Sequence, residues 1–354
     1  MTADRNRCWR VARHSHPGEP FSAELFDWCE EAISEPADGE FLVRTICLAP
    51  GPAQRGYLDK GKERLLERVA VGDVMRGRGV GQIVASRHPE YSEGDIFLGS
   101  LGWQDYSVQR PRGKEFVFST KKITRPILPL STQLGVLGQA GVTAYFGLLE
   151  VGALKQGDRV LVTAGAGGVG SVAGQLAGIN GADITAGTAS TDEKCAWMCD
   201  ELGYDAAINY RTESVDERLA ELFPHGIDLI FDSVGGEILD TALTHLAFHA
   251  RVVICGFIAT DYTIDPLSGP INYRHLLYKR ARMEGFVSFD YWDRYAEAEQ
   301  ALAGWYRDGR LFNSEDVDQG LEKMPDAVAS LFTGGNRGVK ICRVAPDPDR
   351  LPSE

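Results

Sequence analysis

The pattern of hydrophobic and polar residues changes near residue 128. Before it, short apolar runs alternate with glycine and proline, as in EFLVRTICLA (40–49), VMRGRGVGQIVAS (74–86) and DIFLGSLGWQDYSV (95–108). This texture predicts a β-rich unit with tight turns up to about residue 127. From about Leu128, strand-like apolar runs alternate with amphipathic stretches of helical length. That alternation predicts a parallel sheet built from βαβ units.

Six runs in the second part have the length and apolar character of buried strands: 159–164, 182–188, 205–210, 227–233, 250–257 and 282–289. Between the first two, the sequence predicts a helix over Ser171–Asn180 that ends at Gly181. The next helix is predicted to begin with Ser190 as N-cap, with Glu193 completing a capping box, and to end at Gly203.

The final 40 residues are predicted to return to strand, helix and strand after a helix around 291–308. We expect the closing run GVKICRV (338–344) to rejoin the first domain. The expected architecture is therefore an α/β chain in which residues 128–314 form one domain. Residues 1–127 and 315–354 would together form the other.

The chain of 354 residues is long enough for two domains with separate cores. Its net charge of −13 argues against a nucleic-acid partner, which would require a basic surface. We expect neither a secretory signal nor a membrane span, because the first residues are charged and no apolar run is long enough. The seven scattered cysteines suit a soluble cytoplasmic protein with reduced thiols.

A glycine-rich motif directly follows the first strand of the second domain. Gly165-Ala166-Gly167-Gly168-Val169-Gly170 matches GxGxxG and opens a helix, which is the context that dinucleotide binding requires. In such a loop Gly165 permits the sharp turn, Gly167 lets the backbone approach a pyrophosphate, and Gly170 allows close helix–strand packing. The helix N-terminus then offers free N–H groups and a positive dipole end to the phosphates. The sequence therefore predicts a Rossmann domain, a doubly wound parallel sheet.

The end of the second strand indicates which dinucleotide binds. An NAD site usually has a carboxylate there for the ribose 2′-OH, but Thr185–Ala189 contains none. Ser190 and Lys194 follow, and Tyr210 and Arg211 end the third strand. Lys194 is predicted in the first turn of its helix, where a cation is unfavourable unless it meets an anion. NADP(H) is favoured over NAD(H), the alternative being that Lys194 is a solvated surface residue.

Eight segments, in order and well spaced, together resemble one known family: GVLGQAGVTAYFGLLEVG (135–152), AGAGGVGSVAGQLAG (164–178), STDEKC (190–195), DAAINYR (205–211), DSVGGEILD (232–240), VICGFI (253–258), RARMEGFVSFDY (280–291) and GGNRGVK (334–340). The chain resembles the prostaglandin and leukotriene reductases, zinc-independent medium-chain dehydrogenases/reductases. Plant alkenal double-bond reductases and bacterial curcumin reductases belong to the same family. The resemblance covers roughly residues 42–345.

The resemblance implies that the first domain is GroES-like and that the second binds NADP(H). It implies that the Ala166–Val169 turn holds the pyrophosphate and that Lys194 and Tyr210, with Ser190, bind the 2′-phosphate. The residues that would surround the nicotinamide are Ser233, Cys255, Gly256, Phe257, Ile258, Phe286, Val287 and Asn336.

Three positions depart from the family pattern. The family usually has Asp-Pro-Tyr-Met-Arg where this chain has Gly51-Pro-Ala-Gln-Arg55, so that Ala53 replaces an aromatic residue. Ser233 replaces an asparagine, and Asp261 replaces a tyrosine with Tyr262 one place later. All three lie where substrate or nicotinamide would bind in the family.

No metal site is expected. A structural zinc site needs four closely spaced cysteines and a catalytic site a Cys, His and Glu set, and the sequence has neither spacing. Cys195 and Cys199 are four residues apart on one predicted helix without a second pair, which suits core packing.

The expected function is NADPH-dependent hydride transfer to the C=C bond of an α,β-unsaturated carbonyl compound, a small-molecule substrate. The proton would come from water or from a tyrosine, and Tyr262 is the candidate catalytic residue because a phenol can relay a proton. Family habit suggests a homodimer. The alternatives are a quinone reductase of the same superfamily and a non-catalytic NADP(H)-binding sensor.

Overall fold

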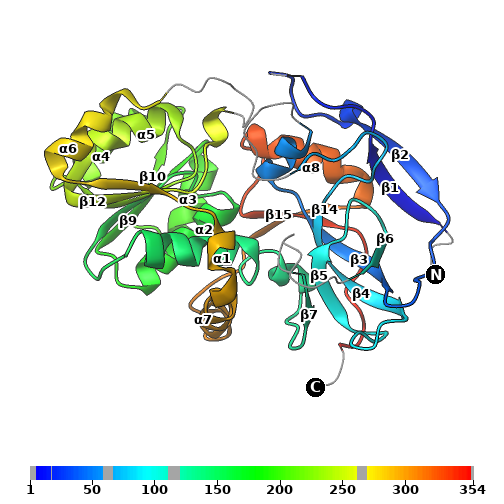
Figure 1. The fold of residues 1–354 in the computed structure, drawn as a ribbon. Coiled ribbons are helices and arrows are strands. Elements are labelled where there is room, and N and C mark those ends of the chain that lie inside the picture. The colour runs from blue at the N-terminus through cyan, green and yellow to red at the C-terminus, as the bar shows by residue number, and fades with distance from the viewer. Residues whose placement is uncertain (1–4, 17, 59–66, 111–119, 261–268, 352–354) are drawn as a thin grey trace. The chain divides into compact units, whose positions relative to one another are not determined.

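The computed structural model describes residues 5–16, 18–58, 67–110, 120–260 and 269–351 (Figure 1). The chain forms two compact units. Unit 1 comprises residues 1–134, 316–335 and 340–354, and unit 2 comprises residues 135–315 and 336–339.

Unit 1 is rich in antiparallel β-structure, as predicted. Its strands are β1 Asn6–Val11, β2 Phe26–Glu31, β3 Phe41–Ala49, β4 Arg78–Ser86, β5 Ile96–Ser100, β6 Tyr106–Gln109, β7 Lys121–Ile123, β14 Glu315–Gln319 and β15 Val339–Arg343. The main sheet has the order β14-β15-β3-β4-β5-β7, and β6 also pairs with β3. The helix α8, Met324–Phe332, lies between β14 and β15 in the sequence. Because Cys342 of β15 pairs with Leu48 of β3, the predicted return of the C-terminal strand is confirmed.

Unit 2 contains a six-stranded parallel sheet. Its strands are β8 Arg159–Val162, β9 Ile184–Ala189, β10 Ala206–Asn209, β11 Ile227–Asp232, β12 Leu246–Ile254 and β13 Arg282–Gly285. The order is β10-β9-β8-β11-β12-β13, in which all six predicted strands are present. The apolar alternation with helices therefore predicted the doubly wound sheet correctly. Only β12 begins earlier than predicted, at Leu246 rather than Ala250.

Helices cover both faces of this sheet. They are α1 Gln139–Tyr145, α2 Gly168–Ile179, α3 Asp192–Leu202, α4 Val215–Leu222, α5 Gly236–Ala242, α6 Arg274–Lys279 and α7 Tyr295–Arg307. α1 packs against α2 and α7, and α4 packs against α5. Figure 1 shows α4, α5 and α6 on the opposite side of the sheet from α1 and α2. Within the described residues, no helix is long and apolar enough to cross a membrane.

The N-cap of α3 differs from the prediction. Thr191 has extended backbone angles, and its hydroxyl accepts a hydrogen bond from the Lys194 amide at 3.3 Å. The predicted capping box between Ser190 and Glu193 is therefore wrong. The predicted helix ends are confirmed in both cases, since Gly181 and Gly203 have left-handed φ values of 86° and 72°.

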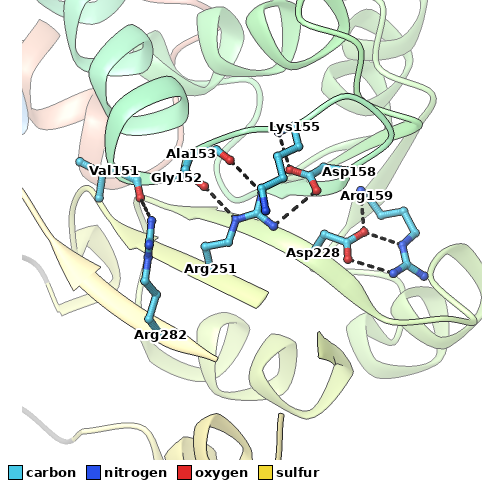
Figure 2. A network of polar contacts seen from close by, with 9 residues as sticks. All are labelled: Val151, Gly152, Ala153, Lys155, Asp158, Arg159, Asp228, Arg251 and Arg282. Atoms are coloured by element: carbon cyan, nitrogen blue, oxygen red, sulfur yellow. Dashed lines mark hydrogen bonds and ion pairs between the residues drawn. The ribbon is translucent and has the colours of Figure 1, made fainter. Parts of the chain in front are cut away.

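A polar network, buried at Arg251 and Asp158, ties the segment after α1 to the strands of the sheet (Figure 2). A π-helical turn, Phe146–Val151, follows α1, and three successive carbonyl groups at its end accept hydrogen bonds from arginines. Arg282 donates to Val151 O at 2.5 Å, and Arg251 donates to Gly152 O at 2.9 Å and to Ala153 O at 3.2 Å. Arg251 also forms an ion pair with Asp158. These bonds satisfy carbonyl groups that the end of a helix leaves without intrahelical partners.

Candidate dinucleotide-binding site

The site lies where the strand order reverses. β8 and β11 are neighbours, and the connections that leave them run to opposite edges of the sheet. The chain continues from β8 to β9 and β10 on one side, and from β11 to β12 and β13 on the other. Such a switch point opens a crevice outside the carboxyl ends of the two strands. The glycine-rich loop follows β8, and the Asp232–Gly236 turn follows β11. Every predicted cofactor residue belongs to unit 2.

The glycine loop is closely packed, although not quite in the predicted way. The left-handed residue of the turn is Ala164, with φ 49°, one position before the first glycine. At Gly165 a Cβ would lie 2.4 Å from Met198 Cε and 3.1 Å from the Tyr204 hydroxyl, so a side chain there would displace the end of Met198. At Gly170 a Cβ would lie 2.2 Å from Ala164 O, as expected for the glycine that lets helix and strand approach.

The first turn of α2 presents backbone amides without a side-chain cap. The N-cap is Gly167, which offers no side chain, and the helical hydrogen bonds begin with Ser171 N to Gly167 O at 2.8 Å. The first turn contains no acidic residue. The amides of Gly168, Val169 and Gly170 therefore lie at the positive end of a helix, a suitable position for an anion.

A segment from the end of the chain runs beside this loop. Gly338 pairs in parallel with Gly167, and its amide donates to Ala166 O at 2.8 Å. The buried side chain of Asn336 donates to Gly338 O at 2.9 Å and so fixes the turn. The segment that carries Asn336 therefore lies beside Ala166 and Gly167, and the role of Asn336 at the nicotinamide stays a prediction.

The carboxyl end of β9 carries no acidic side chain. Ser190 is buried, and Lys194 lies half-buried in the first turn of α3. The first acid after the strand, Asp192, accepts a hydrogen bond from Asn209 Nδ2 at 2.7 Å. Tyr210 is exposed at the end of the neighbouring strand β10, and its amide donates to Ala189 O at 3.1 Å. This end of the sheet therefore offers cationic and hydroxyl groups, with the nearest carboxylate already engaged.

A buried carboxylate joins the two strands at the switch point. Asp232, which is fully buried, accepts hydrogen bonds from Thr163 Oγ1 at 2.7 Å, from Val234 N at 3.2 Å and from Gly235 N at 2.9 Å. Burial raises the pKa of Asp232, and these three hydrogen bonds oppose that shift. The Thr163 hydroxyl also accepts from Ser233 N at 2.9 Å. Neither Thr163 nor Asp232 was predicted, and the available signal was an acid at a strand end shortly before Gly235-Gly236.

Two strand ends bring Ser233 and Cys255 together. The amides of Cys255 and Gly256 both donate to Asp232 O, at 2.7 and 3.2 Å, and Ile258 N donates to Ser233 O at 3.3 Å. Burial raises the pKa of the Cys255 thiol to about 12, and the Ser233 hydroxyl beside it acts in the opposite direction. Phe257 is exposed at the tip of this turn.

Phe286 and Val287 follow β13, the next strand. Phe286 N donates to Ile254 O at 3.4 Å, so that the backbone of Phe286 lies beside the end of β12. A Cβ at Gly147, in the π-helical turn, would lie 2.7 Å from the Phe286 ring and 2.5 Å from Phe231. Gly147 therefore makes room for Phe286. Tyr262, the candidate proton donor, lies outside the described residues.

Tyr204 contacts the end of the glycine loop, and the sequence did not predict this role. Its hydroxyl donates to Gly170 O at 2.7 Å, and a Cβ at Gly174 would lie 2.0 Å from its ring. Burial raises the pKa of Tyr204, so the phenol stays protonated and donates. Within the described part of the chain, no group of three or more His, Cys, Asp or Glu side chains could hold a metal ion.

Two family models match the chain. Residues 7–117 match the N-terminal domain of oxidoreductase, and residues 168–304 match the model described as zinc-binding dehydrogenase. Among solved structures, the chain is similar to that of CurA from Vibrio vulnificus in complex with NADPH. The TM-score is 0.87 and the identity 35%, over 96% of this chain and 100% of that chain.

Three curated relatives match most of their own length. The NADPH-dependent curcumin reductase of Escherichia coli is 35% identical over 97% of this chain and 98% of its own. Prostaglandin reductase 1 of Bos taurus is 34% identical over 95% and 98%, respectively. The NADP(+)-dependent 2-alkenal reductase of Nicotiana tabacum is 34% identical over 86% and 88%. The chain therefore belongs to the prostaglandin, alkenal and curcumin reductase family of the zinc-independent medium-chain dehydrogenases/reductases.

Proposed function

We propose that this chain binds NADP(H) at the switch point of unit 2 and reduces the C=C bond of α,β-unsaturated carbonyl compounds. The observation that carries the proposal is the uncapped N-terminus of α2 beside an acid-free end of β9. The amides of Gly168 to Gly170 suit the pyrophosphate, and Ser190, Lys194 and Tyr210 suit the 2′-phosphate. The first carboxylate, Asp192, is held by Asn209.

The other predicted residues would form the nicotinamide end of the site. When bound, NADPH supplies the hydride that adds to the β-carbon of the substrate. The turns at Ser233 and Cys255–Ile258, with Phe286, Val287 and Asn336, orient the two reactants and exclude water. A hydrogen-bond donor must stabilise the negative charge on the carbonyl oxygen, and a proton must reach the α-carbon. Tyr262 is our proposed proton donor.

The substrate class has its support in the relatives, whose names include a 2-alkenal reductase and a curcumin reductase. The departures at Ala53, Ser233 and Asp261 concern positions where the family binds substrate or nicotinamide. We therefore propose enones or enals as the substrate class and name no particular compound.

Oxidation of NADPH, followed spectrophotometrically with enones, enals and quinones as acceptors, tests this function. Turnover of enones or enals would support it. Turnover of quinones alone would instead make the chain a quinone reductase, and tight NADPH binding without turnover of any acceptor would make it a sensor. We also expect the enzyme to be cytoplasmic, which cell fractionation would check.

We further propose a homodimer formed through the edge of the unit 2 sheet. β13 is an edge strand, and the segment before it exposes Ile271 by 80%, Tyr273 by 66% and Leu277 by 76%. Exposed apolar side chains beside an unpaired strand edge favour pairing with a second copy. Light scattering should give about twice the chain mass of 38.7 kDa, and Leu277→Lys should give the monomer. A monomeric wild-type protein would contradict this proposal.

A further inference from the structure

Arg337 lies in the segment that runs beside the glycine loop. Its neighbours on both sides are fixed, since Asn336 is buried and Gly338 N bonds to Ala166 O. Gly338 has φ 75°, and a Cβ there would lie 2.4 Å from Ser314 O. The backbone at Arg337 is therefore held in place while its side chain is exposed.

The Arg337 side chain reaches α3. Its guanidinium carbon lies 5.2 Å from the centroid of the Trp197 ring, within the range of a cation–π contact. Trp197 is itself buried, and its Nε1 donates to Glu201 Oε2 at 3.1 Å. The indole is thus a fixed platform that holds the guanidinium over α3.

This position lies on the flank of α3 that carries Lys194. Trp197 follows Lys194 by three residues, so the two side chains lie on the same face about one helical turn apart. Lys194 and Arg337 are therefore both placed at this flank of α3, after the acid-free end of β9. A guanidinium adds a planar donor fork that matches phosphate oxygens.

We propose that Arg337 is a second cation of the 2′-phosphate site and, with Lys194, makes the chain selective for NADPH over NADH. The inference rests on the proposed NADP(H) function. On the same helix, the Glu201 carboxylate accepts a hydrogen bond from the Trp197 indole N–H. Cofactor binding would bring the 2′-phosphate to the guanidinium where it lies over Trp197.

The test compares the dissociation constants of NADPH and NADH for wild type, Arg337→Met and Arg337→Lys. The matched control is Arg310→Met, which removes the same charge at the other end of α2, where Arg310 Nη2 donates to Ile179 O at 3.3 Å. Charge-assisted bonds at an exposed site are screened by solvent, so we expect Arg337→Met to weaken NADPH binding about fivefold to tenfold. Arg337→Lys should lose less, and NADH binding should not change.

The salt dependence gives a second readout. The difference between wild type and Arg337→Met should shrink at about 0.5 M salt, because screening shortens the range of the charge interaction. An equal loss with NADPH and NADH, or a loss no greater than that of Arg310→Met, would overturn the inference. If the wild-type protein binds no NADPH, the proposed function itself fails, which is a different result from wild-type binding that Arg337→Met leaves intact.

Discussion

We expect the stability of unit 2 to depend on the buried ion pair between Arg251 and Asp158. Both residues are buried, with exposed fractions of 9% and 7%. We consider Arg251→Met, which keeps most of the side-chain volume but removes the charge and every donor. Asp158 would keep only the bond from Lys155 N, at 2.7 Å, and the carbonyl groups of Gly152 and Ala153 would lose their arginine donors.

The size of the effect follows from the burial. Removing one partner of a buried ion pair typically costs about 3–5 kcal/mol, because the other charge stays buried without compensation. For a unit of 150–250 residues, each kcal/mol lowers Tm by about 2–4 °C. We therefore expect Arg251→Met to lower the Tm of unit 2 by about 6–20 °C. Arg251→Met combined with Asp158→Asn should recover part of this loss, since no buried charge then remains unpaired.

Differential scanning calorimetry measures this effect, and the control is Arg294→Met. Arg294 also makes ion pairs, to Glu150 and Glu297, but its side chain is exposed, so its loss should change Tm little. The KM for NADPH, measured well below Tm, should stay near the wild-type value in Arg251→Met. If Arg251→Met lowers Tm no more than Arg294→Met, the reasoning from buried charge is refuted.

Four further predictions concern cofactor, catalysis, pH and metal. Lys194→Ala should raise the KM for NADPH about 10- to 100-fold and leave NADH kinetics unchanged; equal losses would refute a 2′-phosphate role. Tyr262→Phe should lower kcat at least about tenfold with unchanged NADPH affinity by fluorescence titration, whereas a kcat within about twofold would assign the proton to water. Burial raises the pKa of Asp228, but the hydrogen bonds and charge of Arg159 outweigh it and hold the pKa below its ordinary value of 3.8. A carboxyl group whose pKa is lower in the folded than in the unfolded state stabilises the fold at pH values above its unfolded pKa. The difference in Tm between wild type and Asp228→Asn should therefore be full above about pH 5 and shrink toward pH 3. A difference that does not depend on pH would contradict this. Activity should survive dialysis against EDTA, and stoichiometric zinc by elemental analysis would speak against the predicted absence of metal.

Local sequence signals predicted the parts of the fold that local chemistry controls. The central strands β8 and β11 are largely apolar because both faces of a parallel sheet are buried there. Gly181 and Gly203 end their helices because each takes a left-handed φ. The start of β12 at Leu246 was not predicted. Phe248 and His249 are exposed and His249 has φ 62°, so the first residues of this strand depart from the pattern of a buried strand.

Two kinds of feature could not be predicted from the sequence: the choice between adjacent N-cap residues, and contacts between residues that are far apart in the chain. Ser190 and Thr191 are both good N-caps, and nothing in the sequence decides between them. In the structure β9 runs to Ala189, Ser190 is buried and Thr191 takes the extended conformation of an N-cap. Residues that meet only in the fold, such as Arg337 and Trp197, give no local signal. The sequence therefore predicted the glycine loop and the helix that follows it, but not the side chains that fix or flank them.

Asp232 also explains how the nicotinamide end of the site could change without loss of the cofactor. The turn after β11 is fixed by the Asp232 carboxylate, through Thr163, Val234 and Gly235, and by the main chain of residue 233. None of these bonds uses the side chain at position 233. A serine in place of the family's asparagine can therefore alter the polar groups offered beside Cys255 while the backbone keeps its position. In the proposed site, the side chain at position 233 could therefore vary while the backbone of the same turn keeps its hydrogen bonds.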